Sequence, residues 1–194
     1  MHMGFNLAVF DLDDTLYAER DYVISGFRAV SNALFSGPIK QQTVFERFCE
    51  LFLQDPKRVF DRFVADETAG DGLGEHFLAH AIEVYRDHIP DIRLFAEVDG
   101  VLGSLRAAGL RLAIITDGRS DGQKRKIGAL GLEHKVDRVV YTDLLAPGRA
   151  YWKPHPFAFR SLIDEFTVEP DAAFYVGDNL MKYFDAPLAL GMHA

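Results

Sequence analysis

Three aspartates lie close together near the start of the chain. Asp11, Asp13 and Asp14 directly follow the apolar run 7–10. Because like charges this close repel one another, a chain that fixes them there is expected to hold a cation. The apolar run is typical of a short buried strand, so Asp11 and Asp13 are predicted at its carboxyl end. Open α/β sheets build their sites at that edge.

Three further apolar runs are also followed by polar residues. The run 110–115 leads to Thr116, the run 136–141 leads to a loop, and the run 172–176 leads to Asp178. Helical patterns lie between these runs, and alternating strands and helices are typical of parallel βαβ units. The sequence therefore predicts an α/β domain with a Rossmann-like parallel sheet and helices on both of its faces.

A shared sheet edge would bring distant polar side chains together. We expect Asp11, Asp13, Thr116 and Asp178 to converge at the carboxyl edge, and Lys153, just before a helix, to reach it. Each residue alone is a common turn or cap residue, whereas their joint occurrence favours a site. Mg²⁺ is usually bound by one or two carboxylates, water and a substrate phosphate, so this edge is a candidate magnesium site.

A helical segment separates the first strand from the later ones. Residues 18–93 carry apolar and aromatic side chains at helical spacing, which indicates the core of a small helical bundle. Thr43 and Glu46 fit a capping box at the start of one of these helices. We therefore predict a core domain formed by residues 1–17 and 94–194, interrupted by an inserted all-helical domain, residues 18–93.

The composition is ordinary for a globular chain of 194 residues, with 48% hydrophobic and 26% charged residues. No apolar run approaches the ~20 residues that span a bilayer, and the first residues do not resemble a signal peptide. The net charge of -8 disfavours nucleic acid and anionic membranes as partners. The single cysteine, Cys49, allows no internal disulfide and suits a reducing compartment, so a cytoplasmic location is predicted.

Four short motifs resemble those of the haloacid dehalogenase superfamily of hydrolases, in its phosphatase branch. The family's first motif, Asp-x-Asp-x-Thr, is matched by residues 11–15, and its second, a Thr or Ser that ends an apolar strand, by Thr116. The third, Lys before Pro, is matched by residues 153–154, and the fourth, Gly-Asp, by residues 177–178. The helical segment stands where this family inserts its first type of cap.

The resemblance implies Mg²⁺-dependent hydrolysis of a small phosphate monoester. Asp11 would attack the phosphorus and form an aspartyl-phosphate intermediate. Asp13 would protonate the leaving alcohol and later deprotonate the attacking water. Dehalogenases and phosphonatases of the family lack an Asp at this second position, so Asp13 favours phosphate-ester chemistry. Asp14 is expected to serve only the turn that follows.

The resemblance also implies which residues bind the substrate and the metal. Thr116 and the backbone N–H groups around Asp117 and Gly118 would bind the phosphoryl oxygens. Lys153 and Mg²⁺ would offset the repulsion between the nucleophile and an anionic substrate. The candidate metal ligands are Asp11, Asp13 and Asp178.

One position departs from the family pattern. Members commonly carry a second acid four or five residues after the Asp of the fourth motif, where this chain has Tyr183. Two alternatives therefore stay open beside hydrolysis of a small phosphorylated metabolite: a phosphotransferase such as a phosphomutase on the same core, and a catalytically weak binding protein. The oligomeric state and the substrate cannot be inferred from the sequence.

Other candidate sites give weaker signals. His76 and His80 have the i, i+4 spacing of a zinc pair, but a solvated helix face is the favoured interpretation. The basic run 124–126 is likewise predicted to be a solvated face, with attraction of phosphate as the alternative. The last residues leave little room for a fifth strand.

Overall fold

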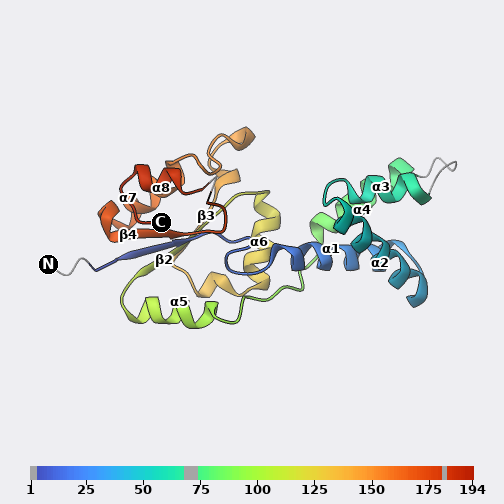
Figure 1. Ribbon diagram of the computed structural model, residues 1–194, viewed down its shortest axis with the longest axis horizontal. Helices are drawn as coiled ribbons and strands as arrows, with labels where there is room; N and C mark the ends of the chain where they lie inside the picture. Colours follow the sequence, from blue (N-terminus) through green and yellow to red (C-terminus); the bar gives the residue numbers. More distant parts are fainter. Residues whose placement is uncertain (1–3, 68–73, 181–182) are drawn as a thin grey trace. The chain divides into compact units, whose positions relative to one another are not determined.

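The computed structural model describes residues 4–67, 74–180 and 183–194 (Figure 1). The chain forms two compact units, which are taken one at a time below. The first, here called the core unit, comprises Met1–Glu19 and Ile92–Ala194. The second, here called the helical unit, comprises Arg20–Asp91. That the helical unit serves as a cap stays a prediction.

The core unit is built on a parallel sheet of four strands in the order β3-β2-β1-β4. Leu7 is in register with Arg111 on one side and with Ala173 on the other. The strands are apolar because helices cover both faces of the sheet. This architecture confirms the predicted α/β fold. The strands are β1 (Leu7–Phe10), β2 (Arg111–Thr116), β3 (Arg138–Tyr141) and β4 (Ala173–Val176).

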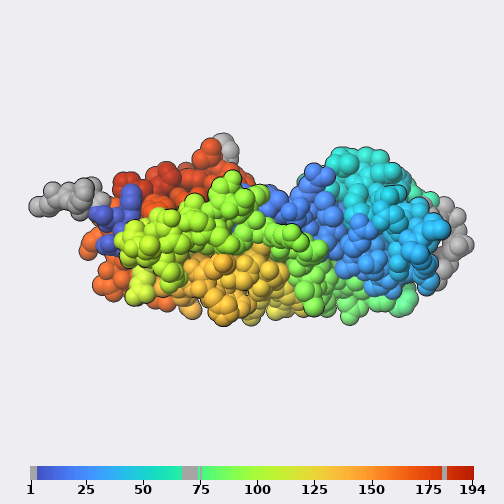
Figure 2. Space-filling model, turned by 90° about the horizontal axis from the view of Figure 1, so that it is seen from below, coloured from blue at the N-terminus to red at the C-terminus, as the bar shows by residue number. Residues whose placement is uncertain are grey.

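Helices cover the two faces of this sheet. Leu7 and Val9, which alternate along β1, contribute to the same buried cluster as Phe159 of α7 and Ala186 of α8. α5 lies on the opposite face (Figure 1) and forms much of the surface of the core unit seen from below (Figure 2). The helices of this unit are α5 (Val98–Ala107), α6 (Ser120–Ala129), α7 (Phe157–Phe166) and α8 (Asp185–Ala189).

The edge of the sheet beside β4 carries one further pairing. His193 forms an isolated parallel bridge with Phe174, donating its N–H to the carbonyl of Ala173 at 2.9 Å. The N–H of Tyr175 donates back to the carbonyl of His193 at 2.8 Å. The short stretch after α8 therefore pairs with β4 at a single position instead of forming a full fifth strand.

The helical unit has an aromatic core, as predicted from the spacing of its apolar residues. Phe27, Phe48 and Phe63 are buried in it, and the rings of Phe48 and Phe63 meet edge to face with centroids 4.8 Å apart. In the part of the chain that the structure describes, no helix is both long and apolar enough to cross a membrane. The helices are α1 (Glu19–Leu34), α2 (Pro38–Gln54), α3 (Val59–Glu67) and α4 (Gly74–Asp87).

The predicted capping box at Thr43 is wrong. α2 begins at Pro38, with Gly37 as its N-cap residue at φ 85°. Proline suits this position because its missing N–H is one that a helix start leaves unpaired anyway. Thr43 therefore lies inside the helix, where its hydroxyl donates to the carbonyl of Ile39 at 2.9 Å.

Candidate active site

A cavity of about 340 Å³ is lined by residues that follow the carboxyl ends of the strands. Its wall includes all but one of the residues predicted to act on substrate or metal. Thr116, the last residue of β2, is the exception, because it is buried beneath the wall. The predicted residues that line the cavity are Asp11, Asp13, Asp117, Gly118, Lys153 and Asp178.

Asp11 is fixed directly after β1 and is 5% exposed. Its Oδ1 accepts hydrogen bonds from the backbone N–H of Leu12 at 2.8 Å and from Nζ of Lys153 at 2.5 Å. No hydrogen bond from the described residues reaches its Oδ2. Burial raises the pKa of Asp11, and the charge of Lys153 opposes this shift. Oδ2 is therefore the oxygen available to a ligand.

Lys153 is held from several sides at the start of the loop before α7. Its Nζ also donates to the carbonyl of Ile115 at 3.1 Å and to the hydroxyl of Tyr175 at 3.4 Å. The ring centroid of Tyr183 lies 4.3 Å from the same ammonium, which is a cation–π contact. Burial raises the pKa of Tyr183 to about 12, so its hydroxyl is neutral at neutral pH. The lysine therefore has a fixed position beside the carboxylate of Asp11.

Both carboxylate oxygens of Asp13 accept hydrogen bonds. Its Oδ1 accepts from the hydroxyl of Tyr17 at 2.5 Å and from Nζ of Lys126 at 2.7 Å. Its Oδ2 accepts from Nε2 of Gln123 at 2.8 Å. Both α6 residues are buried. Asp13 is thus a partly exposed carboxylate held by three donors, in contrast to Asp11.

The residues after β2 form a second wall of the cavity. Gly118 has φ 113°, in the left-handed region that favours glycine, and this turn begins the approach to α6. Thr116 accepts a hydrogen bond of 2.5 Å from Nε2 of Gln123 at its hydroxyl oxygen. The same amide nitrogen reaches Asp13. Gln123 therefore connects the end of β2 with the residues that follow β1.

Asp117 brings a partly unsatisfied carboxylate to this wall. Its Oδ1 accepts from the hydroxyl of Thr142 at 2.7 Å and from the backbone N–H of Lys153 at 3.2 Å. Its Oδ2 is buried and has no hydrogen-bond partner in the part of the chain that the structure describes. The same holds for Nε1 of Trp152, which lines the same cavity. Such groups cost roughly 1–3 kcal/mol each unless something satisfies them. The wall is therefore suited to a polar ligand.

Asp178 completes the acidic side of the cavity. It follows β4, is exposed, and its oxygens accept no hydrogen bond from the described residues. Those residues contain no group of three or more His, Cys, Asp or Glu arranged for a metal, and His76 and His80 are exposed on α4. Mg²⁺ needs only one or two carboxylates besides water and phosphate. The free oxygens of Asp11 and Asp178 fit such an ion, whereas a role for Asp13 as a ligand stays a prediction.

The sequence interpretation missed the contribution of α6. Lys124 is exposed, as predicted for the basic run, but the prediction is wrong for Lys126, which is 5% exposed and paired with Asp13. Consecutive basic residues are typical of the exposed surface of a helix. For this reason the buried Lys126 was assigned to that surface together with the rest of the run. The available signal was helical spacing, because the buried positions of this helix and its end are Gln123, Lys126, Ile127 and Leu130.

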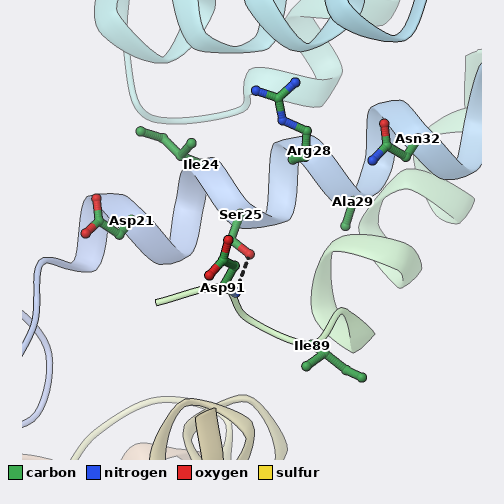
Figure 3. Close-up of a pocket in the computed structure, with 8 residues that line it drawn as sticks. All are labelled: Asp21, Ile24, Ser25, Arg28, Ala29, Asn32, Ile89 and Asp91. Carbon is green, nitrogen blue, oxygen red and sulfur yellow. Dashed lines mark hydrogen bonds between the residues drawn. The ribbon is translucent and has the colours of Figure 1, made fainter. Parts of the chain in front are cut away.

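The helical unit contains a separate hollow of about 440 Å³ along α1 (Figure 3). Ser25, on this helix, accepts a hydrogen bond from the backbone N–H of Asp91 at 2.8 Å. Arg28, on its rim, donates to Oε1 of Gln42 at 2.7 Å and lies 3.5 Å from the ring centroid of Phe45. The polar groups here are therefore used in joining the elements of the helical unit to one another.

Comparison with known proteins identifies the class to which this fold and site belong. The family model described as haloacid dehalogenase-like hydrolase matches residues 8–191. The chain therefore belongs to the haloacid dehalogenase-like hydrolases, which confirms the resemblance of the four motifs.

Similar curated proteins are named as phosphatases. A phosphoserine phosphatase of Thermus thermophilus is 34% identical over 126 residues, which cover 65% of this chain and 47% of that protein. The match thus spans about half of that relative's length. A glyceraldehyde 3-phosphate phosphatase of Methanocaldococcus jannaschii is 25% identical over 201 residues, covering 95% of this chain and 81% of that protein.

Solved structures agree with the fold. A predicted phosphoglycolate phosphatase from Haemophilus somnus has a TM-score of 0.60 and 22% identity, covering 99% of this chain and 84% of that one. A haloacid dehalogenase-type hydrolase from Bacillus subtilis, solved with bound magnesium, has a TM-score of 0.62 and 17% identity, covering 97% and 86%. At these identities the comparison concerns the fold alone.

Proposed function

We propose that this chain hydrolyses a small phosphate monoester through an aspartyl-phosphate intermediate, with Mg²⁺ as cofactor. The observation that carries the proposal is the buried pair of Asp11 and Lys153, in which the described residues hydrogen bond to only one carboxylate oxygen of Asp11. An ammonium at this position favours the ionised nucleophile and reduces its repulsion of a phosphate dianion. The named activities of the curated relatives support the same reaction.

The first step transfers the phosphoryl group to the protein. Oδ2 of Asp11 forms a bond to phosphorus while the bond from phosphorus to the ester oxygen breaks. Asp13 gives its proton to that oxygen, which leaves as an alcohol. Thr116, the N–H groups around Asp117 and Gly118, and Lys153 are the proposed partners of the phosphoryl oxygens.

The second step restores the carboxylate. Water attacks the phosphorus of the acyl phosphate and gives a proton to Asp13 as the bond between Oδ2 of Asp11 and phosphorus breaks. Phosphate leaves, and Asp13 again holds the proton needed for the next turnover. The pair of steps uses one water molecule and releases one alcohol and one phosphate.

The proposed metal site consists of Asp11 and Asp178, with Asp13 as the third candidate. When bound, Mg²⁺ supplies positive charge that stabilises the phosphoryl oxygens and the nucleophile in one arrangement. The carboxylate oxygens offered by these residues are ligands that suit Mg²⁺. The acidic cavity needs such a charge, because Asp117 and Asp178 both lie on its wall.

We further propose that the helical segment, residues 18–93, is the cap that selects the substrate and excludes water. The cavity of about 340 Å³ has a size that suits a small phosphorylated metabolite, and we do not propose nucleic acid as the substrate. The names of the curated relatives, which concern phosphoserine and glyceraldehyde 3-phosphate, support that size class. A cytoplasmic location agrees with such a substrate.

Release of inorganic phosphate tests the proposal. The protein is assayed on a panel of phosphate monoesters with Mg²⁺, with EDTA, and as Asp11→Asn. We expect activity that needs Mg²⁺ and falls by at least ~10⁴-fold in Asp11→Asn. Asp14→Asn is the matched control, because it removes the same charge three positions away at a turn residue, and it should change activity only a few-fold.

The same panel separates the alternatives. Undiminished activity in EDTA or in Asp11→Asn would overturn the mechanism. Transfer to a sugar hydroxyl instead of water would indicate a phosphotransferase. An inactive parent protein across the panel would favour a binding function.

A further inference from the structure

We propose that Gln123 and Lys126 are positioning residues that hold Asp13 so that its Oδ2, and not its Oδ1, exchanges the proton with the leaving group. This inference rests on the proposed phosphatase function. It concerns two α6 side chains that lie one helical turn apart, and both are buried. Neither residue belongs to the four motifs.

Oδ1 of Asp13 has no room for a proton. It accepts from Nζ of Lys126 at 2.7 Å and from the hydroxyl of Tyr17 at 2.5 Å. These two donors use both lone pairs of that oxygen. A proton placed on Oδ1 would point at an ammonium or displace a hydroxyl donor. Lys126 therefore directs the acidic proton to the other oxygen.

Oδ2 of Asp13 keeps one lone pair for that proton. Among the described residues, a single donor reaches it: Nε2 of Gln123 at 2.8 Å. The second N–H of the same amide donates to the hydroxyl oxygen of Thr116 at 2.5 Å. Because Asp13 and Thr116 share one donor group, the acid and the phosphate-binding hydroxyl are fixed relative to each other.

The hydrogen bonds to Asp13 matter in the step that breaks the ester bond. As the bond from phosphorus to the ester oxygen breaks, the proton moves from Oδ2 of Asp13 to that oxygen. Oδ1 keeps its contact with Lys126, so the new carboxylate is stabilised as it forms. In the hydrolysis step a proton from water returns to Oδ2. Loss of Lys126 should therefore matter most for leaving groups that need a proton.

A purely structural role would give a different result. Removing one partner of a buried ion pair is destabilising, but the side chain of Asp13 is 23% exposed and keeps its hydrogen bonds from Tyr17 and Gln123, so a folded variant is expected from Lys126→Met. Methionine keeps much of the length of the lysine stem beside Ile127, which is buried on the same helix. A structural contribution would lower activity on all substrates alike.

The test compares kcat/KM for two substrates that differ in their leaving groups. Glycerol 2-phosphate releases an alcohol that needs a proton, whereas 4-nitrophenyl phosphate releases a stable phenolate. This parameter ends at phosphoryl transfer, so later hydrolysis does not obscure the result. The variants are Lys126→Met, Lys126→Arg, Gln123→Met and, as a matched control on the exposed side of α6, Lys124→Met.

We expect Lys126→Met to lower kcat/KM by about 10²-fold or more on glycerol 2-phosphate, but by less than about tenfold on 4-nitrophenyl phosphate. Lys126→Arg should recover part of the loss, and Lys124→Met should match the parent protein on both substrates. Gln123→Met should show the same substrate dependence with a smaller loss. It also serves as the deciding variant if Lys126→Met does not fold by circular dichroism.

Equal losses on both substrates, or no loss on either, would overturn the inference while leaving the proposed function intact. If the parent protein releases phosphate from neither substrate nor from the wider panel, it is the proposed function that fails. The parent rates are measured first, so the two failures are distinguishable.

Discussion

Lys153 and Asp11 form a buried ion pair at the end of β1, with Nζ and Oδ1 2.5 Å apart and side chains 1% and 6% exposed. The residues are 142 positions apart in the chain. The charge of Lys153 offsets the free-energy cost of burying the ionised carboxylate of Asp11. The proposed nucleophile has to be ionised. The pair therefore links the stability of the core unit to its proposed chemistry.

Removal of the lysine alone should destabilise the protein. Lys153→Met leaves Asp11 buried without its cation, and the loss of one partner from such a pair costs about 3–5 kcal/mol. Urea denaturation measures the free energy of unfolding. The double variant Asp11→Asn/Lys153→Met should lose less than the single one, because no uncompensated charge remains. Equal stability of Lys153→Met and the parent would contradict a stabilising pair.

Asp178 should control the metal requirement more than the binding of substrate. Asp178→Asn keeps the size of the side chain and removes a carboxylate that no described residue engages. We expect the Mg²⁺ concentration for half-maximal activity to rise by at least ~10-fold. Asp171→Asn, at an exposed position before β4, is the control of equal charge. An unchanged Mg²⁺ dependence in Asp178→Asn would remove this residue from the proposed site.

Tyr183 should act through its ring. The ring lies 4.3 Å from Nζ of Lys153, so Tyr183→Phe keeps the cation–π contact and should retain activity within a few-fold. Tyr183→Asp introduces the acid that the resemblance of the motifs leads us to expect here, and should raise Mg²⁺ affinity by about tenfold. Titration with Mg²⁺ while following thermal stability measures both variants. If neither variant changes the titration, the departure from the family pattern has no consequence for the metal.

Cys49 should react slowly in the native protein. The thiol is half-buried in the helical unit, and burial raises its pKa against the opposing charges of Arg28 and Arg20. A raised pKa leaves a smaller thiolate fraction, so alkylation at pH 8 should be about tenfold slower than in urea. The rate with iodoacetamide, followed by mass spectrometry, measures this. Equal rates in buffer and in urea would contradict the burial of the thiol.

Much of the core unit could be predicted from local patterns. Four apolar runs gave the strands because buried parallel strands need no polar alternation. Asp11 and Asp178 each follow a strand, and they could be predicted to lie near each other because parallel strands share a carboxyl edge. In the structure both line the same cavity. The same logic applied to Lys153, although only the structure shows that it is buried beside Asp11.

The support around Asp13 could not be predicted in this way. Its contacts with Gln123 and Lys126 join residues 110 and 113 positions apart, and depend on how α6 packs. In the local sequence, helical spacing with Gln123 and Leu130 is the one signal that sets the buried Lys126 apart from its neighbours in the basic run. The start of α2 was missed for the opposite reason, because a local signal at Thr43 was outweighed by Pro38.

Asp11 is proposed to carry the phosphoryl group between the two steps, so trapping the phosphorylated protein gives a direct test. The protein is mixed with excess 4-nitrophenyl phosphate and Mg²⁺, quenched in acid within milliseconds, and digested for mass spectrometry. We expect one added phosphoryl group on the peptide that contains Asp11, and hydroxylamine should remove it. The signal should be absent in Asp11→Asn and present in Asp14→Asn. Turnover without any labelled peptide, or a label that persists in Asp11→Asn, would contradict a role for Asp11 as the nucleophile.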